Sequence, residues 1–462
     1  MARFLYTLLT CAMLPWALLH LLWRARRQPE YLRHWRERFG FFPAVALLPA
    51  RRVLAGTLWL HAVSVGETRA AEPLVAALRQ RYPDHRILLT HMTPTGRATS
   101  EALFGDRVER IYLPYDLPWA VHSFLRRYQP ELGLILETEL WPNLLAACRE
   151  ASVPVLLVNA RLSARSAARY ARFTALTREA LHNLSAIGAQ TLADAARLGA
   201  LGATAVTVTG NMKFDIEPPP AQLELAQTFR ARCGPRPTWL AASTREGEEA
   251  LILEAWKKLG SDEATALQGG RAKNALLAVA DGETAKSVAD PRPLLIIVPR
   301  HPQRFDAVAR LAQERGFRVQ RRSENQDIAA TTEVLIGDSM GEMFAWYGAA
   351  DLAFIGGSLK DFGSQNLIEA AAVGTPVLIG PSTFNFADAV REALACGAAR
   401  PVQDADDLVG QVLALLADPA ARARMSAAGR EFSAHHRGAT ARTLALIDLE
   451  KAASGKTAMA RS

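Results

Sequence analysis

Short apolar runs alternate with amphipathic segments along most of this chain, and no other feature restricts its possible folds so strongly. The runs in the first half that we predict to be strands are TLWLHAV, HRILLTH, RVERIYLPY, LGLILE, PVLLVNA, SAIGAQ and AVTVTGN. Those in the second half are TWLAAST, PLLIIVPR, EVLIGD, DLAFIGG and PVLIGP. Helices that separate parallel strands cover both faces of the sheet, so this pattern predicts the α/β class with doubly wound, Rossmann-like parallel sheets.

The chain has 462 residues, more than one hydrophobic core usually serves, so two domains are expected. Three consecutive prolines in IEPPP, at residues 216–220, would interrupt any helix or strand and form a stiff linker. We therefore predict a first domain over 46–215, a second over 221–445, and a tail over 446–462. Residues 261–293 are polar and rich in Gly and Ala, and we predict a surface insertion with no assigned role. Ligands of such sheets bind beyond the carboxyl ends of the strands, where a common cleft is expected.

The segment Phe4–Trp23 carries no charged residue over twenty positions, about the length of a helix that crosses a bilayer core. Three arginines follow it, Arg24, Arg26 and Arg27. Because positive charge gathers on the cytoplasmic side of membrane helices, we predict an anchor and juxtamembrane basic segment over 1–45 with both domains in the cytoplasm. A cleaved signal peptide is the alternative, although its apolar region is usually shorter.

The juxtamembrane sequence EYLRHWRERFGFFP mixes aromatic and basic residues. One interpretation places it along the headgroup surface, with Trp35, Phe39 and Phe41 dipping into the bilayer and the arginines on lipid phosphate. The alternative is a solvated helix packed on the first domain.

Composition and spacing exclude several function classes. Lys and Arg outnumber Asp and Glu by 54 to 46, a formal net charge of +8 that suits phosphates, acidic sugars or acidic lipid surfaces. The four cysteines are widely scattered, so neither disulfides nor a zinc site is predicted. No GxGxxG follows the first strand and no GxxxxGK[ST] occurs, which argues against dinucleotide oxidoreductases and P-loop NTPases.

The first predicted strand ends at His61 and turns through Ser64-Val65-Gly66 to Glu67, at the start of a predicted helix. A carboxylate at this strand end could accept a proton from a sugar hydroxyl that attacks an anomeric carbon. Glu67 could equally serve only to complement the helix dipole. Its position in the sequence favours neither role.

A second acidic cluster, Glu137 and Glu139 in ETELWPN, follows the fourth predicted strand. Carboxylates this close raise each other's pKa, so one could carry a proton or orient a cation, although either could simply cap a helix. Arg161, Arg165 and Lys213 follow other strands of this domain and could bind an anionic sugar or phosphate. For the two arginines, a solvated surface charge is the simpler interpretation.

Loops after the strands of the second domain predict a nucleotide site. Ser243 begins STREGE after its first strand, with hydroxyls and backbone amides at a helix start that could bind an anion. Arg300 lies in PRHPQRF, and the sequences GDSMGE and GGS follow other strands. In GSQNLIE the carboxylate of Glu369 could hold a ribose diol. Each loop alone is a weak signal, but together they converge on one pocket.

In order along the chain, SVGE, TPTG, ETELWPN, NARLS, GNMKFD, PRHPQRF, GDSMGE, GGS and GPSTFNF resemble the 3-deoxy-D-manno-octulosonic acid (Kdo) transferases of lipopolysaccharide synthesis, glycosyltransferase family 30. The resemblance runs to about residue 440. It implies that the chain has a GT-B fold and that the protein is located at the cell inner membrane. It further implies inverting transfer from CMP-Kdo to the lipid A precursor lipid IVA, with neither a metal ion nor a separate cofactor. Nucleic acid is not expected among the partners.

The same resemblance implies roles for individual residues. Glu67 matches the general base, and Glu137 and Lys213 match residues that stabilise the transition state. The resemblance implies contacts to the donor from Pro299, Arg300, Met340, Gly341, Glu342, Asn366, Leu367, Ile368 and Glu369. We add Ser243 to these contacts because of its position after the strand.

Two departures and two alternatives accompany this interpretation. Many family members carry His before the Asn of the glycine-rich turn, whereas this chain has Gln365, which can donate a hydrogen bond but cannot act as an acid. The stretch 261–293 is also longer than the family's usual connection. A nucleotide-sugar epimerase on the same scaffold would be soluble and need no acceptor. A non-catalytic membrane protein that binds nucleotide sugars is the other alternative.

Overall fold

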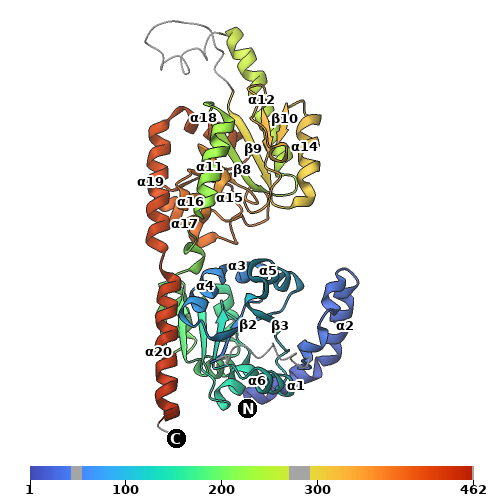
Figure 1. Ribbon diagram of the computed structural model, residues 1–462, viewed down its shortest axis with the longest axis vertical. Helices are drawn as coiled ribbons and strands as arrows, with labels where there is room; N and C mark the ends of the chain where they lie inside the picture. The colour runs from blue at the N-terminus through green and yellow to red at the C-terminus, as the bar shows by residue number, and fades with distance from the viewer. Residues whose placement is uncertain (43–54, 270–291, 460–462) are drawn as a thin grey trace. The chain divides into compact units, whose positions relative to one another are not determined.

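Two seven-stranded sheets, each entirely parallel, form the framework of the chain, as the alternating sequence pattern predicts (Figure 1). The structure is a computed structural model that describes residues 1–42, 55–269 and 292–459. It divides into unit 1, which comprises Met1–Asp215 with His436–Ser462, and unit 2, which comprises Ile216–His435.

The sheet of unit 1 has the strand order β3-β2-β1-β4-β5-β6-β7. Its strands are β1 (Gly56–His61), β2 (His85–His91), β3 (Glu109–Tyr112), β4 (Leu132–Leu136), β5 (Val155–Ala160), β6 (Ala186–Ala189) and β7 (Val206–Val208). β1 pairs with β2 on one side and with β4 on the other. The chain therefore reverses its direction of winding between β1 and β4, which is the position where such sheets bind ligands.

Alternate residues of the strands face the two helical layers of unit 1. Trp59 of β1 packs in one cluster with helices α6, α7, α9 and α10, whereas Leu58 and Leu60 pack in the other with α4, α5 and the C-terminal helix α20 (Ala439–Met459). Because both faces are covered, the strands are apolar almost throughout. The helices between α3 and α10 are α3 (Val65–Ala70), α4 (Glu72–Arg81), α5 (Pro94–Phe104), α6 (Pro118–Tyr128), α7 (Pro142–Glu150), α8 (Ala164–Ala171), α9 (Thr174–His182) and α10 (Leu192–Ala200), with 3₁₀ turns η3 (Gly105–Arg107) and η4 (Met212–Phe214).

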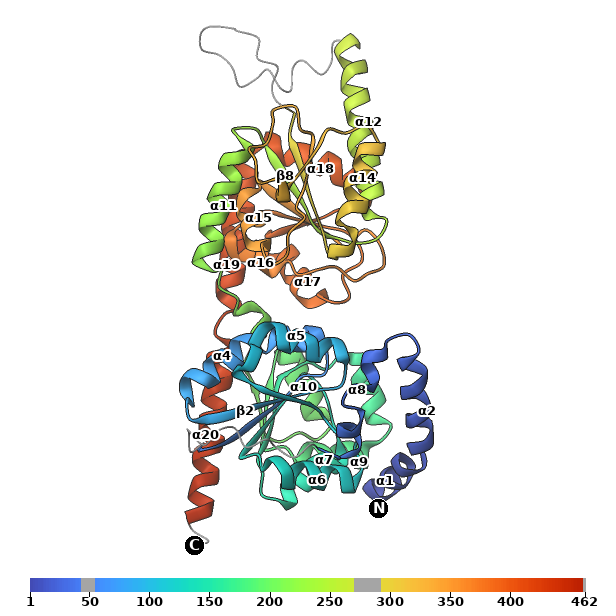
Figure 2. The same ribbon diagram turned by 45° about the vertical axis from the view of Figure 1, so that its right-hand side comes forward.

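The predicted single helix over Phe4–Trp23 is wrong, because the segment forms two helices, α1 (Ala2–Ala12) and α2 (Leu14–Ala25), bent by 48°. Pro15 lies in the first turn of α2, where its missing N–H removes a hydrogen bond that a continuous helix would need. Among the described residues no single helix meets the length and hydropathy of a membrane span; only this bent pair does so together. Figure 2 shows both helices along one side of unit 1.

The juxtamembrane segment packs on unit 1 as two 3₁₀ turns, η1 (Pro29–Leu32) and η2 (Trp35–Phe39). Phe39 is buried with Leu21, Ala25 and Tyr31, so the prediction that it dips into a bilayer is wrong. Arg38 is buried as well, with its guanidinium 3.9 Å from the ring centroid of Tyr112, and the prediction that all the arginines meet lipid phosphate fails for it.

The C-terminal helix α20 (Ala439–Met459) belongs to unit 1, so the predicted end of the second domain at 445 and the predicted tail over 446–462 are corrected. Ile447 packs under the sheet of unit 1. Asp448 accepts a hydrogen bond from Tyr82, and Lys451 pairs with Glu131 at 2.7 Å. A sequence without clear apolar periodicity thus docks through both polar and apolar contacts.

Asp215, the last residue of unit 1 before the linker, caps α20. Its carboxylate accepts backbone N–H bonds from Gly438 at 2.6 Å, from Ala439 at 3.3 Å and from Thr440. The first N–H groups of a helix have no partner within it, so the carboxylate satisfies them and complements the helix dipole.

The sheet of unit 2 has the order β10-β11-β9-β8-β12-β13-β14. Its strands are β8 (Thr238–Thr244), β9 (Leu294–Pro299), β10 (Val319–Arg321), β11 (Val334–Ile336), β12 (Leu352–Ile355), β13 (Val377–Ile379) and β14 (Ala399–Pro401). The direction of winding reverses here between β8 and β12, which pair directly. β10 and β14 were not predicted.

The helices of unit 2 cover both faces of its sheet, and Trp239 of β8 packs with α12, α14, α18 and α19. They are α11 (Pro220–Cys233), α12 (Glu248–Gly269), α14 (Phe305–Glu314), α15 (Met343–Ala349), α16 (Ile368–Val373), α17 (Ala387–Ala395), α18 (Ala405–Ala417) and α19 (Pro419–His436), with 3₁₀ turns η5 (Pro302–Arg304) and η6 (Arg322–Glu324). The predicted linker 216–220 ends where α11 begins. The predicted insertion is helical as far as Gly269, and its residues 270–291 lie outside the described residues.

We predict that Asp215→Ala lowers the stability of unit 1 by about 1–2 kcal/mol, because three helix N–H groups lose their acceptor. Asp215→Asn, which keeps one carbonyl oxygen, should lose less. Urea unfolding and limited proteolysis of α20 measure the effect, and Asp84→Ala, at an exposed aspartate of the same unit, is the matched control. Equal stability of the Asp215 and Asp84 variants would contradict the capping role.

Candidate functional site

The candidate residues of unit 1 lie at the reversal of its sheet. Glu67 follows β1 and Glu137 follows β4, the two neighbouring strands between which the winding changes direction. Chain segments leave such strands on opposite sides, so a hollow opens above their carboxyl ends. The structure therefore places both carboxylates where a ligand is expected.

Glu67 is held by a capping arrangement at the start of α3. Its Oε2 accepts the backbone N–H of Val63 at 2.7 Å, and its Oε1 accepts the hydroxyl of Ser64 at 2.9 Å. Ser64 is the N-cap, and its side chain accepts the N–H of Glu67 at 3.5 Å. Glu67 thus lies in the first turn of α3, where its charge can complement the helix dipole, the alternative role that the sequence left open. Four lone-pair sites on a carboxylate leave room for a further proton donor.

The protonation of Glu67 is shifted towards neutrality. The side chain is 9% exposed, and this burial raises its pKa to about 7 from the ordinary 4.5, with further increases from the nearby charges of Glu137 and Glu139. The hydrogen bonds from Val63 and Ser64 oppose the shift. A carboxylate with a pKa near 7 gains and loses protons readily at neutral pH, which is what general-base catalysis requires.

Glu137 adopts a left-handed backbone conformation, with φ of +57°, directly after β4. Its N–H donates to the carbonyl of Val158 at 3.0 Å, so the neighbouring strand holds it there. Glycine adopts this conformation readily because it has no Cβ, whereas a glutamate held in it is often found at a functional site. Burial and the charge of Glu137 raise the pKa of Glu139, in agreement with the predicted repulsion.

Lys213 completes this group from η4. Its Nζ lies 3.7 Å from Oε1 of Glu137. Asn211 caps the turn by accepting the N–H of Lys213 at 3.0 Å, and Asn159 accepts the N–H of Met212 at 3.0 Å. The three predicted catalytic residues therefore share one electrostatic environment.

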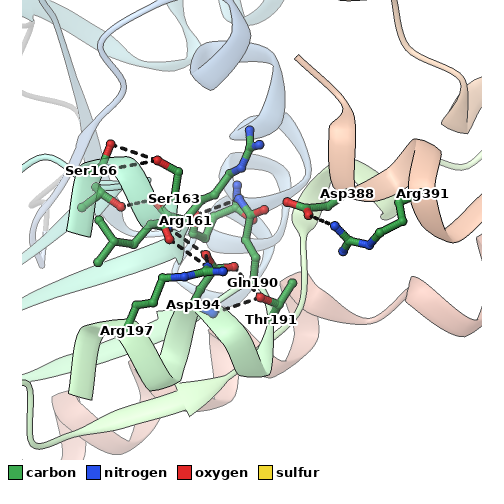
Figure 3. A network of polar contacts seen from close by, with 12 residues as sticks. Arg161, Ser163, Ser166, Gln190, Thr191, Asp194, Arg197, Asp388 and Arg391 are labelled. Carbon is green, nitrogen blue, oxygen red and sulfur yellow. Dashed lines mark hydrogen bonds and ion pairs between the residues drawn. The ribbon is translucent and has the colours of Figure 1, made fainter. Parts of the chain in front are cut away.

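Arg161 and Arg165 differ in their surroundings. The carbonyl of Arg161 accepts the hydroxyl of Thr138 from the acidic loop, whereas Arg165 is exposed on α8. Figure 3 shows Arg161 beside a polar network in which Asp194 accepts the N–H of Leu162 at 2.9 Å and pairs with Arg197 at 3.4 Å. This network fixes the loop after β5, whose backbone in turn holds the acidic loop.

Sequence reasoning missed several residues that hold the site in place. The S-x-x-E spacing of Ser64 and Glu67 is a known capping signal and could have been recognised. Asn159 has a φ of +53° within β5, and its fully buried side chain orients η4, but no local sequence signal identifies it. His61 and His91, also at strand ends, are fully buried, and burial lowers their pKa values to about 3 and 4, so both are neutral.

The candidate residues of unit 2 gather at the corresponding reversal, between β8 and β12. Ser243 near the end of β8 has a φ of +54°, and a Cβ on Gly356 after β12 would come within 2.6 Å of its carbonyl oxygen. Only glycine fits there. Buried Glu248 joins the two loops, because its carboxylate accepts the N–H groups of Arg245 at 2.8 Å and Gly357 at 2.6 Å.

The remaining predicted donor contacts lie in neighbouring loops of unit 2. Arg300, just after Pro299 of β9, donates its Nε–H to Oε1 of Gln365 at 3.1 Å. Glu342 pairs with Arg322 at 3.1 Å, and Asn366 donates to Glu369 at 3.2 Å.

Side-chain exposure separates the other predicted contacts in these loops. Met340 is exposed and Gly341 has a φ of +79°. The side chains of Leu367 and Ile368 are buried in the core, so they support the loop from behind.

No group of three or more His, Cys, Asp or Glu side chains that could hold a metal ion occurs within the described ranges. The hydrogen-bonding groups around the unit 2 loops are instead guanidinium, amide and carboxylate groups, which are suited to an organic anion with hydroxyls.

The raised pKa of Glu67 makes stability depend on pH. The folded protein holds this proton more tightly than the unfolded chain, so ionisation of Glu67 removes stability as the pH rises from about 4.5 through about 7. Glu67→Gln cannot ionise, and we predict that its stability relative to the unmodified protein increases by up to about 3 kcal/mol over that range. Urea unfolding at several pH values measures this difference, with Glu101→Gln, at an exposed glutamate of α5, as control. A difference that stays constant with pH would contradict the shift.

Comparisons with known proteins agree on one family. A family model described as 3-deoxy-D-manno-octulosonic-acid transferase (kdotransferase) matches residues 33–216, and one described as glycosyl transferases group 1 matches residues 273–432. A 3-deoxy-D-manno-octulosonic acid transferase of Bordetella pertussis is 45% identical, over 97% of this chain and 99% of that protein. One of Haemophilus influenzae is 37% identical, over 97% and 98%.

Solved structures match with less sequence identity. A glycosyltransferase from Rickettsia africae ESF-5 has a TM-score of 0.50 and 12% identity, over 86% of this chain and 98% of that one. A putative UDP-N-acetylglucosamine 2-epimerase from Listeria monocytogenes also has a TM-score of 0.50, with 14% identity over 85% and 95%. Because a transferase and an epimerase match equally, these likenesses show the two-domain GT-B-like fold alone.

Proposed function

The chain belongs to the family of Kdo transferases and is a glycosyltransferase, and on this premise we propose that it transfers Kdo from CMP-Kdo to lipid IVA with inversion and without a metal ion. The observation that most supports this reaction is the raised pKa of Glu67. Burial raises it to about 7, and Glu67 lies near the ion pair of Glu137 and Lys213. The family implies a place in lipopolysaccharide synthesis.

In the proposed step, Glu67 takes the proton of the acceptor hydroxyl as its oxygen bonds to the anomeric carbon of Kdo. The bond from that carbon to the CMP phosphate oxygen breaks, and its electron pair leaves with CMP. Attack opposite the leaving group inverts the anomeric carbon. Lys213 and Glu137 would stabilise charge around the reacting sugar, which carries a carboxylate of its own.

Unit 2 would hold the donor in this proposal. CMP departs with a single phosphate, which guanidinium groups such as Arg300 and backbone N–H groups can neutralise, so the chemistry needs no metal ion. Glu369, oriented by Asn366, would accept hydrogen bonds from the ribose hydroxyls. The donor would also contact residues of the neighbouring loops: Ser243, Pro299, Met340, Gly341 and Glu342. Leu367 and Ile368 are buried beneath these loops.

We predict that Glu67→Gln lowers kcat by about 10²–10⁴-fold, because positioned general bases contribute rate enhancements of this size. In the unmodified protein the rate should rise with pH through about 7, as Glu67 loses its proton. Glu139→Gln removes a nearby negative charge and should move this rise to lower pH. CMP release that depends on lipid IVA, with mass spectrometry of the lipid product, measures the rates, and Glu101→Gln is the control. Normal turnover by Glu67→Gln would exclude this residue as the base.

We also propose that α1 and α2 bind the cell inner membrane, with the two units in the cytoplasm. Large apolar side chains are exposed along both helices: Phe4, Leu5, Leu8, Leu9, Trp16, Leu19, Leu22 and Trp23. Exposed apolar surface of this kind, next to basic residues such as Arg24 and Arg27, suits an anionic membrane surface.

We predict that Leu9→Glu together with Leu19→Glu reduces binding to vesicles of anionic phospholipid by at least about tenfold, because two apolar contacts are replaced by charges that the membrane repels. Cosedimentation with the vesicles measures this. Leu192→Glu, at a leucine that is 80% exposed on α10, is the matched control. Equal loss in the control, or no loss in the double variant, would contradict membrane binding through these helices.

A further inference from the structure

Asp116 forms a buried polar centre in the loop between β3 and α6. It is 4% exposed, and its carboxylate accepts three hydrogen bonds: from the N–H of Asn143 at 3.0 Å, from the N–H of Leu144 at 2.8 Å and from the hydroxyl of Tyr6 at 3.0 Å. Two donors belong to the first turn of α7 and the third to α1. A buried carboxylate depends strongly on such donors, because no water replaces one that is lost.

Asn143 makes a second link between the same elements. Its side-chain N–H donates to the carbonyl of Asp116 at 2.8 Å, and its Oδ1 accepts the hydroxyl of Thr7 at 2.8 Å. Arg3 adds ion pairs to Glu150 of α7 at 3.6 Å and to Glu179 of α9 at 3.4 Å. α1 is therefore bonded to the N-terminal turn of α7 through two adjacent residues.

That turn directly follows the acidic loop. Residues 137–141 join β4 to α7, and Pro142 opens the helix with a fixed φ. The other end of the loop is held at Glu137, by the N–H bond to Val158. A loop of five residues cannot absorb a displacement of α7 without moving its own side chains, and an error near 1 Å in a catalytic group can lower a rate by about 100-fold.

We propose that α1 is a positioning element for the transfer reaction: Tyr6 and Thr7 hold Asp116 and Asn143, and these hold the first turn of α7 and with it the loop that carries Glu137 and Glu139. This rests on the proposed function of Glu137. Neither Tyr6 nor Asp116 touches the substrate in this role. The N-terminal segment thus has a task within unit 1 that is separate from membrane contact.

Tyr6→Phe and Thr7→Val test the proposal, since each removes one hydroxyl and leaves the apolar part of the side chain. We expect each to lower kcat by about tenfold while the KM for CMP-Kdo changes less than twofold, because unit 2 is untouched. The two losses should be less than additive, since both act through one network. Thr10→Val is the matched control: its hydroxyl donates only to the carbonyl of Thr7 within α1, at 2.9 Å.

Hydrogen–deuterium exchange of the full-length protein gives a readout that needs no turnover. In Tyr6→Phe, exchange at the amides of Asn143 and Leu144 should become at least about fivefold faster, while in Thr10→Val it should not change. Asp116→Asn should show a larger effect, and if it fails to fold, Tyr6→Phe still decides. Unchanged exchange, or a kcat equal to that of the control, would overturn the positioning role. If the unmodified protein releases no CMP, the proposed function fails, and the exchange data still test the coupling.

Discussion

Carboxylates that accept backbone N–H groups hold together the parts of this protein on which its site depends. Asp116 does so for α7, Asp215 for α20, and Glu248 for the loops after β8 and β12. Each joins segments that are distant in the sequence, through charge-assisted bonds that are stronger than neutral ones. Without these carboxylates, backbone N–H groups in the irregular segments would lack hydrogen-bond acceptors.

Glu67 also accepts a backbone N–H group, but the effect of burial on its pKa exceeds the effect of its hydrogen bonds. It accepts one backbone N–H and one hydroxyl, and two further carboxylates lie close enough to raise its pKa. Burial therefore outweighs hydrogen bonding, and the group can change its protonation near neutral pH. The same residue lies where it complements a helix dipole and can act as a base, so the two roles that the sequence offered as alternatives are compatible. Lys213 limits the repulsion by pairing with Glu137.

The sequence predicts those parts whose stabilisation is local. All twelve predicted strands are present. Most of them are apolar because both of their faces are buried, although β3 begins with the partly exposed Glu109 and Arg110 and β7 is largely exposed. β10 and β14 have three residues each, VQR and ARP, with no apolar run, and form only because an edge is available beside β11 and β13. The return of α20 to unit 1 depends on Asp215 and Ile447, and the orientation of η4 on Asn159. These contacts are distant in the sequence, so no local pattern records them.

Gln365 lies at the position where the family resemblance leads us to expect His, and this difference bears on the pH dependence of the loops in unit 2. Its Oε1 accepts the Nε–H of Arg300, and an amide oxygen keeps this ability at every pH. A neutral imidazole could accept the same bond, but a protonated one could not and would repel the guanidinium. His301 lies nearby, and burial together with Arg245 and Arg300 lowers its pKa, so it stays neutral at physiological pH. Neither Gln365 nor His301 therefore changes its charge near neutral pH, so neither side chain accounts for a change of rate in that range.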